Sequence, residues 1–399
     1  MHDHIPLNNL QNHRSFEPRR PYTTLSSPSD VGRRHSKMGI MGSIRVAISY
    51  AFDWAILVVF AVAGYILGNL TPQKRPFSLG NPDISFPLYD DTVSIRNAFL
   101  ICIVAPILII LVVSLLFVPG STVPPGTPKS IIWRRKLWEI HAGWLGLIFS
   151  VIATWFIVST TKNLLGKPRP NAIARCQPDL ENIAQYIVGG VAATTSSTPG
   201  QLVSADICKN PDASVVNDGF RSFPSGHSSI AASGLVYLTF FLASKFGVTA
   251  PWAPRTEGLT EQSHSAFPSR IVGDIEMQGS DANSAPREPT NNRPISSVRR
   301  QAAAPPIYLV LLTMVPFCVC IFICASRWFD FMHHGVDIFV AFAIGSVTSY
   351  FGFRFYHLPI AQGAGWAWGP RSEDAAFWAG VGRQGYGHGM DKGRHYYMG

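Results

Sequence analysis

The chain has 399 residues, of which 47% are hydrophobic and 14% are charged, and its formal net charge is +9 at pH 7. Because about a quarter of the residues of an ordinary soluble domain are charged, this composition argues against a soluble globular protein and indicates a membrane protein. No nucleic-acid-binding motif accompanies the positive charge, so we expect no nucleic acid partner and attribute the charge to basic loops beside anionic lipid head groups.

Six apolar runs have about the length that crosses a bilayer. In chain order they are Val46 to Gly68, Ala98 to Val118, Ile140 to Thr160, Ser228 to Phe246, Pro306 to Ala325 and Val336 to Phe353. The sequence therefore predicts an all-α, polytopic membrane protein with six transmembrane helices.

The polar segments divide the chain further. We expect a disordered cytoplasmic N-terminal tail at 1–45, helices one to four at 46–246, a disordered loop at 247–305, helices five and six at 306–355 and a flexible tail at 356–399. The loop is rich in Ser, Pro, Arg and Asn, a composition that cannot bury an apolar core.

Most of the 33 Lys and Arg residues fall in the two tails and in the second and fourth loops. Since basic residues are retained on the cytoplasmic side, both tails should be cytoplasmic, and the third loop should lie in a lumen or outside the cell. Vacuole, Golgi, endoplasmic reticulum and plasma membrane all remain open. Cys176 and Cys208 lie in that third loop, where a disulfide could form, but the sequence alone does not establish the pairing.

Three polar clusters border the spans on this outer face. The stretch "TKNLLGKPRP" carries Lys162, Lys167 and Arg169, and "SRWFDFMHHGVD" carries Arg327. Single basic residues at a span edge usually extend toward water. Several cations on the non-cytoplasmic side are unexpected, because basic residues tend to stay on the cytoplasmic side when the protein inserts into the membrane. Their convergence there indicates a site for an anion with several oxygens. Phosphate is the natural candidate.

The second cluster, "FPSGHSS", precedes the fourth run. Ser225 offers a hydroxyl, Gly226 permits close approach of a backbone N–H, and the start of a helix favours negative charge. His227 could deliver a proton to a leaving alkoxide, as general acid catalysis requires.

In "MHHGVD", His333 and Asp337 are four residues apart and would share one face of a helix. The carboxylate could then accept a hydrogen bond from one imidazole nitrogen and leave the other free as a nucleophile. Zinc bound by His333, His334 and Asp337 is the rival interpretation. Adjacent histidines diverge on a helix and the nearby cations oppose a dication, so we expect neither a metal nor another cofactor.

Together these residues resemble the signature of the type 2 phosphatidic acid phosphatase (PAP2) family of lipid phosphate phosphatases. Lys162 with Arg169 and Pro170 resembles its first part, Pro224 to His227 its second, and Ser326, Arg327, His333 and Asp337 its third. The resemblance implies a six-helix core and metal-independent hydrolysis. It implies His333 as nucleophile, Asp337 as the partner that orients His333, and His227 as leaving-group acid. It also implies five phosphate-binding residues: Lys162, Arg169, Ser225, Gly226 and Arg327.

Within the family the chain looks most like fungal and plant enzymes for phosphatidic acid and diacylglycerol pyrophosphate. A phosphatase for a sphingoid base phosphate or a polyprenyl pyrophosphate remains an alternative, as does a non-catalytic protein that binds lipid phosphate. A transporter is disfavoured because the polar clusters lie at one membrane face rather than at the midplane. The oligomeric state stays open.

Overall fold

A computed structural model describes residues 28–120, 123, 126–190, 200–249, 304–360, 366–371 and 376–377, with side chains from Ile44 onward. The expected disorder of 1–27, of 250–303 and of the C-terminal end beyond 377 lies outside these residues. The chain separates into two units, Met1–Ala51 with Pro370–Gly399, and Phe52–Gly369. The second unit contains every residue of the candidate site.

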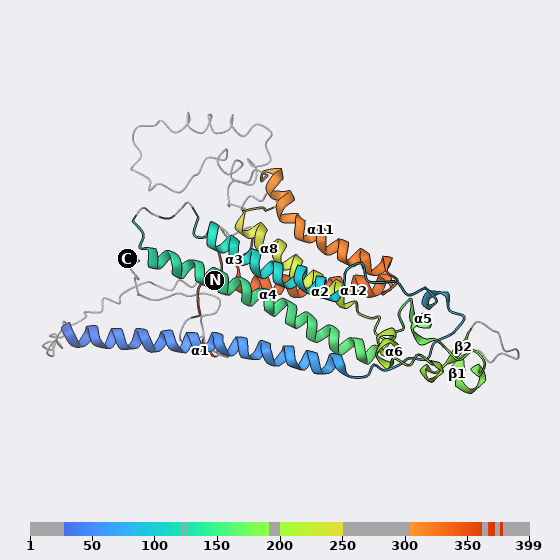
Figure 1. Ribbon diagram of the computed structural model, residues 1–399. Coiled ribbons are helices and arrows are strands. Elements are labelled where there is room, and N and C mark those ends of the chain that lie inside the picture. The colour runs from blue at the N-terminus through green and yellow to red at the C-terminus, as the bar shows by residue number, and fades with distance from the viewer. Residues whose placement is uncertain are drawn as a thin grey trace, which may run out of the picture. The chain divides into compact units, whose positions relative to one another are not determined.

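Six helical spans in the described residues are long and apolar enough to cross a membrane, which confirms the predicted number and the helical class (Figure 1). They are Ile44–Asn69 within α1 (Pro28–Asn69), Ile95–Phe117, α4 (Lys129–Leu165), Gly226–Lys245, α11 (Ile307–Phe329) and α12 (Gly335–Tyr356). The second span consists of α2 (Ile95–Phe99), a π-helical stretch η2 (Leu100–Val104) and α3 (Ala105–Phe117). The fourth consists of α7 (Gly226–Ala231), a π-helical stretch η5 (Ala232–Val236) and α8 (Tyr237–Lys245). The protein is an integral membrane protein.

Two helices extend beyond the predicted runs. Helix α1 begins at Pro28, so residues 28–45, which we expected to belong to a disordered tail, are helical in the structure. Proline suits the first turn of a helix, and the next proline, Pro72, follows the end of α1. Helix α4 runs past both ends of its apolar core because Lys and Arg are good helix formers, although they do not belong in a bilayer.

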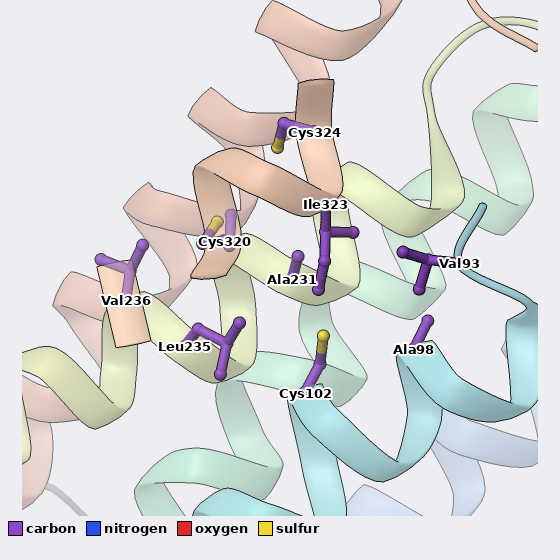
Figure 2. Close-up of a cluster of buried hydrophobic side chains, with 10 residues drawn as sticks. Val93, Ala98, Cys102, Ala231, Leu235, Val236, Cys320, Ile323 and Cys324 are labelled. Atoms are coloured by element: carbon purple, nitrogen blue, oxygen red, sulfur yellow. The ribbon is translucent and has the colours of Figure 1, made fainter. Parts of the chain in front are cut away.

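The two π-helical stretches meet beneath the end of the spans at which α4 ends and α7 begins. We call this the outer end, and the opposite end the inner one, as labels for the two ends of the molecule only. A Cβ atom on Gly234 in η5 would lie 1.8 Å from the carbonyl oxygen of Cys102 in η2, so only glycine permits this contact. Around it, side chains from the first outer loop, α2, η2, α7, η5 and α11 form a buried apolar cluster (Figure 2). Its labelled members are Val93, Ala98, Cys102, Ala231, Leu235, Val236, Cys320, Ile323 and Cys324. This cluster supports the floor of the candidate site.

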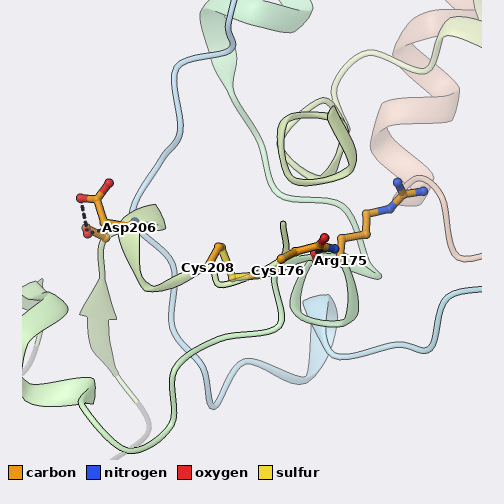
Figure 3. The surroundings of a disulfide bond; sticks show 6 residues. Arg175, Cys176, Asp206 and Cys208 are labelled. Atoms are coloured by element: carbon orange, nitrogen blue, oxygen red, sulfur yellow. Dashed lines mark hydrogen bonds between the residues drawn. A yellow bond between two sulfur atoms is a disulfide. The ribbon is translucent and has the colours of Figure 1, made fainter. Parts of the chain in front are cut away.

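The outer loops form a small structured layer of their own. Its elements are η1 (Pro82–Ile84), α5 (Ala172–Cys176), η3 (Ile183–Tyr186), β1 (Ile187–Gly190), β2 (Gln201–Val203), η4 (Ala205–Ile207) and α6 (Ala213–Gly219). Strands β1 and β2 pair antiparallel. A second buried cluster that includes Phe77, Val203 and Phe220 lies inside this layer. Cys176 and Cys208 form a disulfide there, which decides the pairing that the sequence left open (Figure 3).

At the opposite end of the spans, Glu139 of α4 is fully buried and is surrounded by donors. Its carboxylate pairs with Lys245 at the end of α8 (2.5 Å) and with Arg135 (3.2 Å), and it accepts a hydrogen bond from the backbone N–H of Ala367 (3.0 Å). Within 356–399, where we expect a flexible tail, the backbone at Ala367 thus satisfies a buried carboxylate.

Candidate active site

Six of the eight predicted site residues line one cavity of about 640 Å³ at the outer ends of the spans. They are Lys162, Arg169, Gly226, His227, Arg327 and His333. Lys162 belongs to the last turn of α4, Gly226 and His227 open α7, and Arg327 belongs to the last turn of α11. Residues up to 171 positions apart in the chain thus meet because four spans end at the same level.

Two buried arginines are held rigidly by carboxylates. Arg169 donates from Nη2 to Asp218 Oδ1 (2.7 Å) and from Nε to the Asp218 carbonyl (2.8 Å). Arg327 pairs with Asp330 (2.7 Å) and with Asp91 of the first outer loop (2.8 Å). Fixed cations of this kind need no reorganisation when a negatively charged group arrives.

Thr92 anchors the first outer loop at the same place. Its backbone N–H donates to Asp330 Oδ2 (2.9 Å) and its hydroxyl donates to Asp330 Oδ1 (2.6 Å). Phe86 of this loop stacks on Phe331, with ring centroids 4.6 Å apart. The loop therefore holds Asp91 at the wall of the cavity, beside Arg327.

The start of α7 brings small residues and an imidazole to the cavity. A Cβ atom on Gly226 would lie 3.3 Å from Lys162 Nζ, so glycine lets the ammonium group approach the backbone. In the described part of the chain, His227 Nε2 is buried and has no hydrogen-bond partner. A buried polar atom without a partner that faces a cavity with cations is typical of a group that forms a hydrogen bond to a bound ligand.

Ser225 has a different position from the one predicted. Its side chain caps α7 by accepting from Ser228 N–H (3.4 Å) and from the Ser228 hydroxyl (3.0 Å), and it does not line the cavity. Serine is a preferred N-cap residue, so a helix start explains its presence without a ligand.

His333 is almost fully buried, and its Nδ1 lies 2.6 Å from the carbonyl oxygen of Ser222. A carbonyl can only accept, so Nδ1 carries the hydrogen and the lone pair lies on Nε2. Burial, together with the charges of Arg169 and Lys162, holds the pKa of His333 well below the ordinary value of 6.5. The ring is therefore neutral at physiological pH.

Asp337 does not orient His333 by a direct hydrogen bond, which corrects the arrangement inferred from their spacing. Helix α12 begins at Gly335, so His333 precedes it and the rule for residues four apart on a helix does not apply. The Asp337 carboxylate instead pairs with Lys167 (2.7 Å) and accepts hydrogen bonds from Ser222 Oγ (2.5 Å) and His334 Nδ1 (3.2 Å).

The two adjacent histidines have different partners, since Nδ1 of His333 faces a carbonyl and Nδ1 of His334 faces a carboxylate. Among the described residues, no group of three or more His, Cys, Asp and Glu side chains is placed to hold a metal ion.

Several charged residues of the cavity wall were not identified from the sequence. Besides the predicted residues, Arg175, Arg221, Asp91 and Asp218 line the cavity, so five basic and two acidic side chains surround it. Arg175 pairs with Asp218 (3.0 Å), and its side chain extends away from the neighbouring disulfide (Figure 3). The position of Arg175 beside Cys176, and of Arg221 just before the "SFPSGH" stretch, was the available signal.

Asp218 shows the effect of these cations. Burial alone would raise its pKa, but Arg169 and Arg175 more than offset this, and the pKa lies below its ordinary value. Asp218 is therefore a carboxylate, and it fixes both arginines. Two acids among five bases leave the cavity with a surplus of positive charge.

The rest of the cavity wall is largely apolar. It includes Tyr65 of α1, Ile95 and Phe99 of α2, and Trp155 and Val158 of α4. These residues belong to three membrane-spanning helices, so the charged end of the cavity continues into an apolar part at the level of the bilayer.

Comparisons with known proteins identify relatives of this chain. A curated relative, probable lipid phosphate phosphatase 4 of Arabidopsis thaliana, is 25% identical over 81% of this chain and 78% of its own length. Diacylglycerol pyrophosphate phosphatase 1 of Saccharomyces cerevisiae is 24% identical over 77% of this chain and 80% of its own. The probable diacylglycerol pyrophosphate phosphatase 1 of Schizosaccharomyces pombe is 32% identical over 48% of this chain and 59% of its own.

No solved structure matches the chain significantly. The family model of the PAP2 superfamily matches residues 143–360, which include all eight predicted site residues and more than half of the chain. The chain belongs to the PAP2 superfamily.

Proposed function

We propose that this membrane protein is a lipid phosphate phosphatase that hydrolyses phosphatidic acid to diacylglycerol, and that also accepts diacylglycerol pyrophosphate and lysophosphatidic acid. The observation that carries the proposal is the contact between His333 Nδ1 and the Ser222 carbonyl oxygen, from which the tautomer of His333 follows. With Nδ1 bound to the Ser222 carbonyl, the Nε2 lone pair is available in a cavity that also contains His227 and fixed cations.

In the first step, His333 Nε2 attacks phosphorus, and the bond between phosphorus and the lipid oxygen breaks while a phosphohistidine forms. His227 gives its proton to the departing lipid alkoxide. In the second step, His227 takes a proton from water, the water oxygen attacks phosphorus, and the bond to His333 breaks to release inorganic phosphate. Lys162, Arg169 and Arg327 stabilise the charge on the equatorial oxygens in both steps, so the reaction needs no metal ion.

The two parts of the cavity fit a lipid with a charged head. The surplus of positive charge suits a phosphomonoester, and the apolar wall of Tyr65, Phe99 and Trp155 gives the start of the acyl chains an apolar surface. Active-site residues at the ends of spans allow the lipid to keep most of its chains in the bilayer.

Arg221 extends the basic wall and supports diphosphate substrates. Its guanidinium donates to Asn163 Oδ1 (2.8 Å) and to the carbonyl of Leu70 (2.7 Å), near the end of α1. A diphosphate has a second anionic group beside the reacting one, and Arg221 is the cation that we assign to it.

The test measures phosphate release from phosphatidic acid and diacylglycerol pyrophosphate in detergent micelles that contain EDTA. We expect release by the intact protein and none by His333→Ala, and acid quenching of a reaction with terminally ³²P-labelled substrate should trap label on the intact protein only. Equal release by both proteins would exclude His333 as the nucleophile. Release that EDTA abolishes would contradict the metal-independent mechanism.

The active site should face a lumen or the cell exterior, in agreement with the distribution of basic residues. Labelling of a single cysteine introduced at Lys209, in the outer loop layer, by a membrane-impermeant thiol reagent on sealed vesicles of known orientation would test this.

A further inference from the structure

Lys167 is one of the outer-face cations singled out in the sequence, yet it does not line the cavity. Its ammonium group pairs with Asp337 Oδ1 at 2.7 Å, and the Asp337 side chain is fully buried. Its backbone carbonyl accepts a hydrogen bond from Ser222 N–H (3.0 Å). Lys167 thus contacts both residues that lie behind His333.

Ser222 connects the carboxylate to the imidazole. Its side chain is fully buried, its hydroxyl donates to Asp337 Oδ2 (2.5 Å), and its carbonyl oxygen accepts from His333 Nδ1 (2.6 Å). The Asp337 carbonyl in turn accepts from Ser225 N–H (3.2 Å). The peptide segment that carries the acceptor for His333 is therefore fixed at its amide, at its side chain and three residues further along.

We propose that Lys167, Asp337 and Ser222 form a positioning frame for His333. Lys167 holds Asp337, Asp337 holds the Ser222 hydroxyl, and the Ser222 carbonyl fixes the Nδ1–H tautomer and the ring orientation. None of the three touches the substrate. The inference rests on the proposed function, because it assigns these residues to the attack by His333 Nε2.

The frame has a kinetic consequence. A hydrogen bond from Nδ1–H to a fixed carbonyl strengthens as the ring gains positive charge during attack, so it acts on the transition state more than on the bound substrate. A small displacement of a nucleophile lowers the rate by a large factor without weakening binding. Loss of the frame should therefore lower kcat and leave KM nearly unchanged.

The experiment compares Ser222→Ala and Lys167→Met with two matched controls in the outer loop layer, Ser204→Ala and Lys209→Met. Hydrolysis of phosphatidic acid is measured in detergent micelles, together with inhibition by inorganic phosphate. Both frame variants should lose about 10- to 100-fold in kcat, with KM and the inhibition constant of phosphate changed less than about twofold. The controls should stay within about twofold of the intact protein.

Conservative and combined variants sharpen the test. Ser222→Cys replaces the hydroxyl by a slightly larger thiol, which is a weaker donor, and its activity should fall between those of serine and alanine. Lys167→Arg should recover most of the activity that Lys167→Met loses. The Ser222→Ala and Lys167→Met double variant should lose about as much as the worse single variant, because both act through Asp337.

Three results would overturn the inference. The first is a kcat within twofold of the intact protein in both frame variants. The second is a parallel rise of KM and of the phosphate inhibition constant in Lys167→Met, which would mean that Lys167 binds phosphate. The third is a loss of kcat in the double variant that equals the product of the two single losses. If Ser222→Ala fails to fold by size-exclusion chromatography, Ser222→Cys and Lys167→Arg carry the comparison. An intact protein inactive on every lipid phosphate would instead contradict the proposed function.

Discussion

The two ends of the spans bury charged groups in different ways. At the inner end, Glu139 is surrounded by Lys245, Arg135 and the backbone of Ala367, so cations and a donor balance its charge. At the outer end, Arg169 and Arg327 are also buried, but each borders an open cavity with a surplus of cations. The comparison teaches that burial of charge alone does not mark a site, whereas burial beside an unfilled and unbalanced space does.

Each end also buries imidazole nitrogen that lacks a hydrogen-bond partner among the described residues. His227 Nε2 faces the cavity. Both ring nitrogens of His357 are buried without a partner, and the imidazole ring stacks on Phe353, with the ring centroids 4.9 Å apart. Substitution of these two histidines should give the largest difference in kcat between the two ends. We expect His227→Ala to lower kcat for phosphatidic acid about 10³-fold, because the leaving alkoxide loses its proton donor.

His357→Phe is the matched variant at the inner end, and it should keep kcat within about twofold in the same assay. A phenyl ring can take the stacked position and buries no unsatisfied nitrogen, so the variant should be at least as stable as the intact protein. Similar losses of activity in both variants would mean that the two imidazoles do not differ in the way we infer.

The next effect is on stability rather than on rate. Glu139→Ala leaves Lys245 buried without its carboxylate and the N–H of Ala367 without its acceptor, and it should cost about 3 kcal/mol of unfolding free energy. Chemical denaturation in micelles measures this, with Asp179→Ala in the outer layer as the control. A variant as stable as the intact protein would show that this cluster does not hold the inner end together.

A smaller effect concerns substrate choice. Arg221→Met should lower kcat/KM for diacylglycerol pyrophosphate about tenfold more than for phosphatidic acid, equivalent to about 1.4 kcal/mol, because only the diphosphate has a second charge for Arg221 to bind. Arg75→Met, an exposed arginine of the first outer loop, should leave the ratio unchanged. An equal loss for both substrates would assign Arg221 to the reacting phosphate or to the fold.

The smallest effect depends on pH. The folded pKa values of His333 and His357 lie well below 6.5, because both rings are buried and cations lie nearby. Below pH 6.5 the unfolded chain therefore binds more protons than the folded one. As the pH decreases further, the free energy of unfolding falls by at most about 1.4 kcal/mol per pH unit for each histidine, until the folded pKa is reached. Above pH 6.5 neither histidine contributes.

Denaturation of the intact protein and of His357→Phe at pH 7.5 and 5.5 tests the sign, and the variant should show the weaker dependence. Over the same range His333 should stay neutral, so it should impose no loss of kcat/KM with a midpoint near 6.5. Equal dependence in both proteins would show that His357 titrates normally in the folded state.

The sequence by itself determined the six spans, because a run of about twenty apolar residues is unstable when exposed to water and has the length that crosses a bilayer as a helix. It also determined which polar clusters reach one face, since alternate loops lie on the same side. The sequence alone therefore predicts one site that contains five of the residues lining the cavity: Lys162, Arg169, His227, Arg327 and His333.

The tertiary structure alone decided how the other polar groups pair. The spacing of His333 and Asp337 suggested a shared helix face, but α12 begins only at Gly335. His333 therefore lies before the helix, and its Nδ1 contacts the carbonyl of Ser222, which is 111 positions away in the chain. Asp218 and Ala367 meet their partners across 49 and 228 positions in the chain. Periodicity and spacing describe contacts within one helix, whereas contacts between helix ends and loops depend on how the spans pack, and no local pattern contains that information.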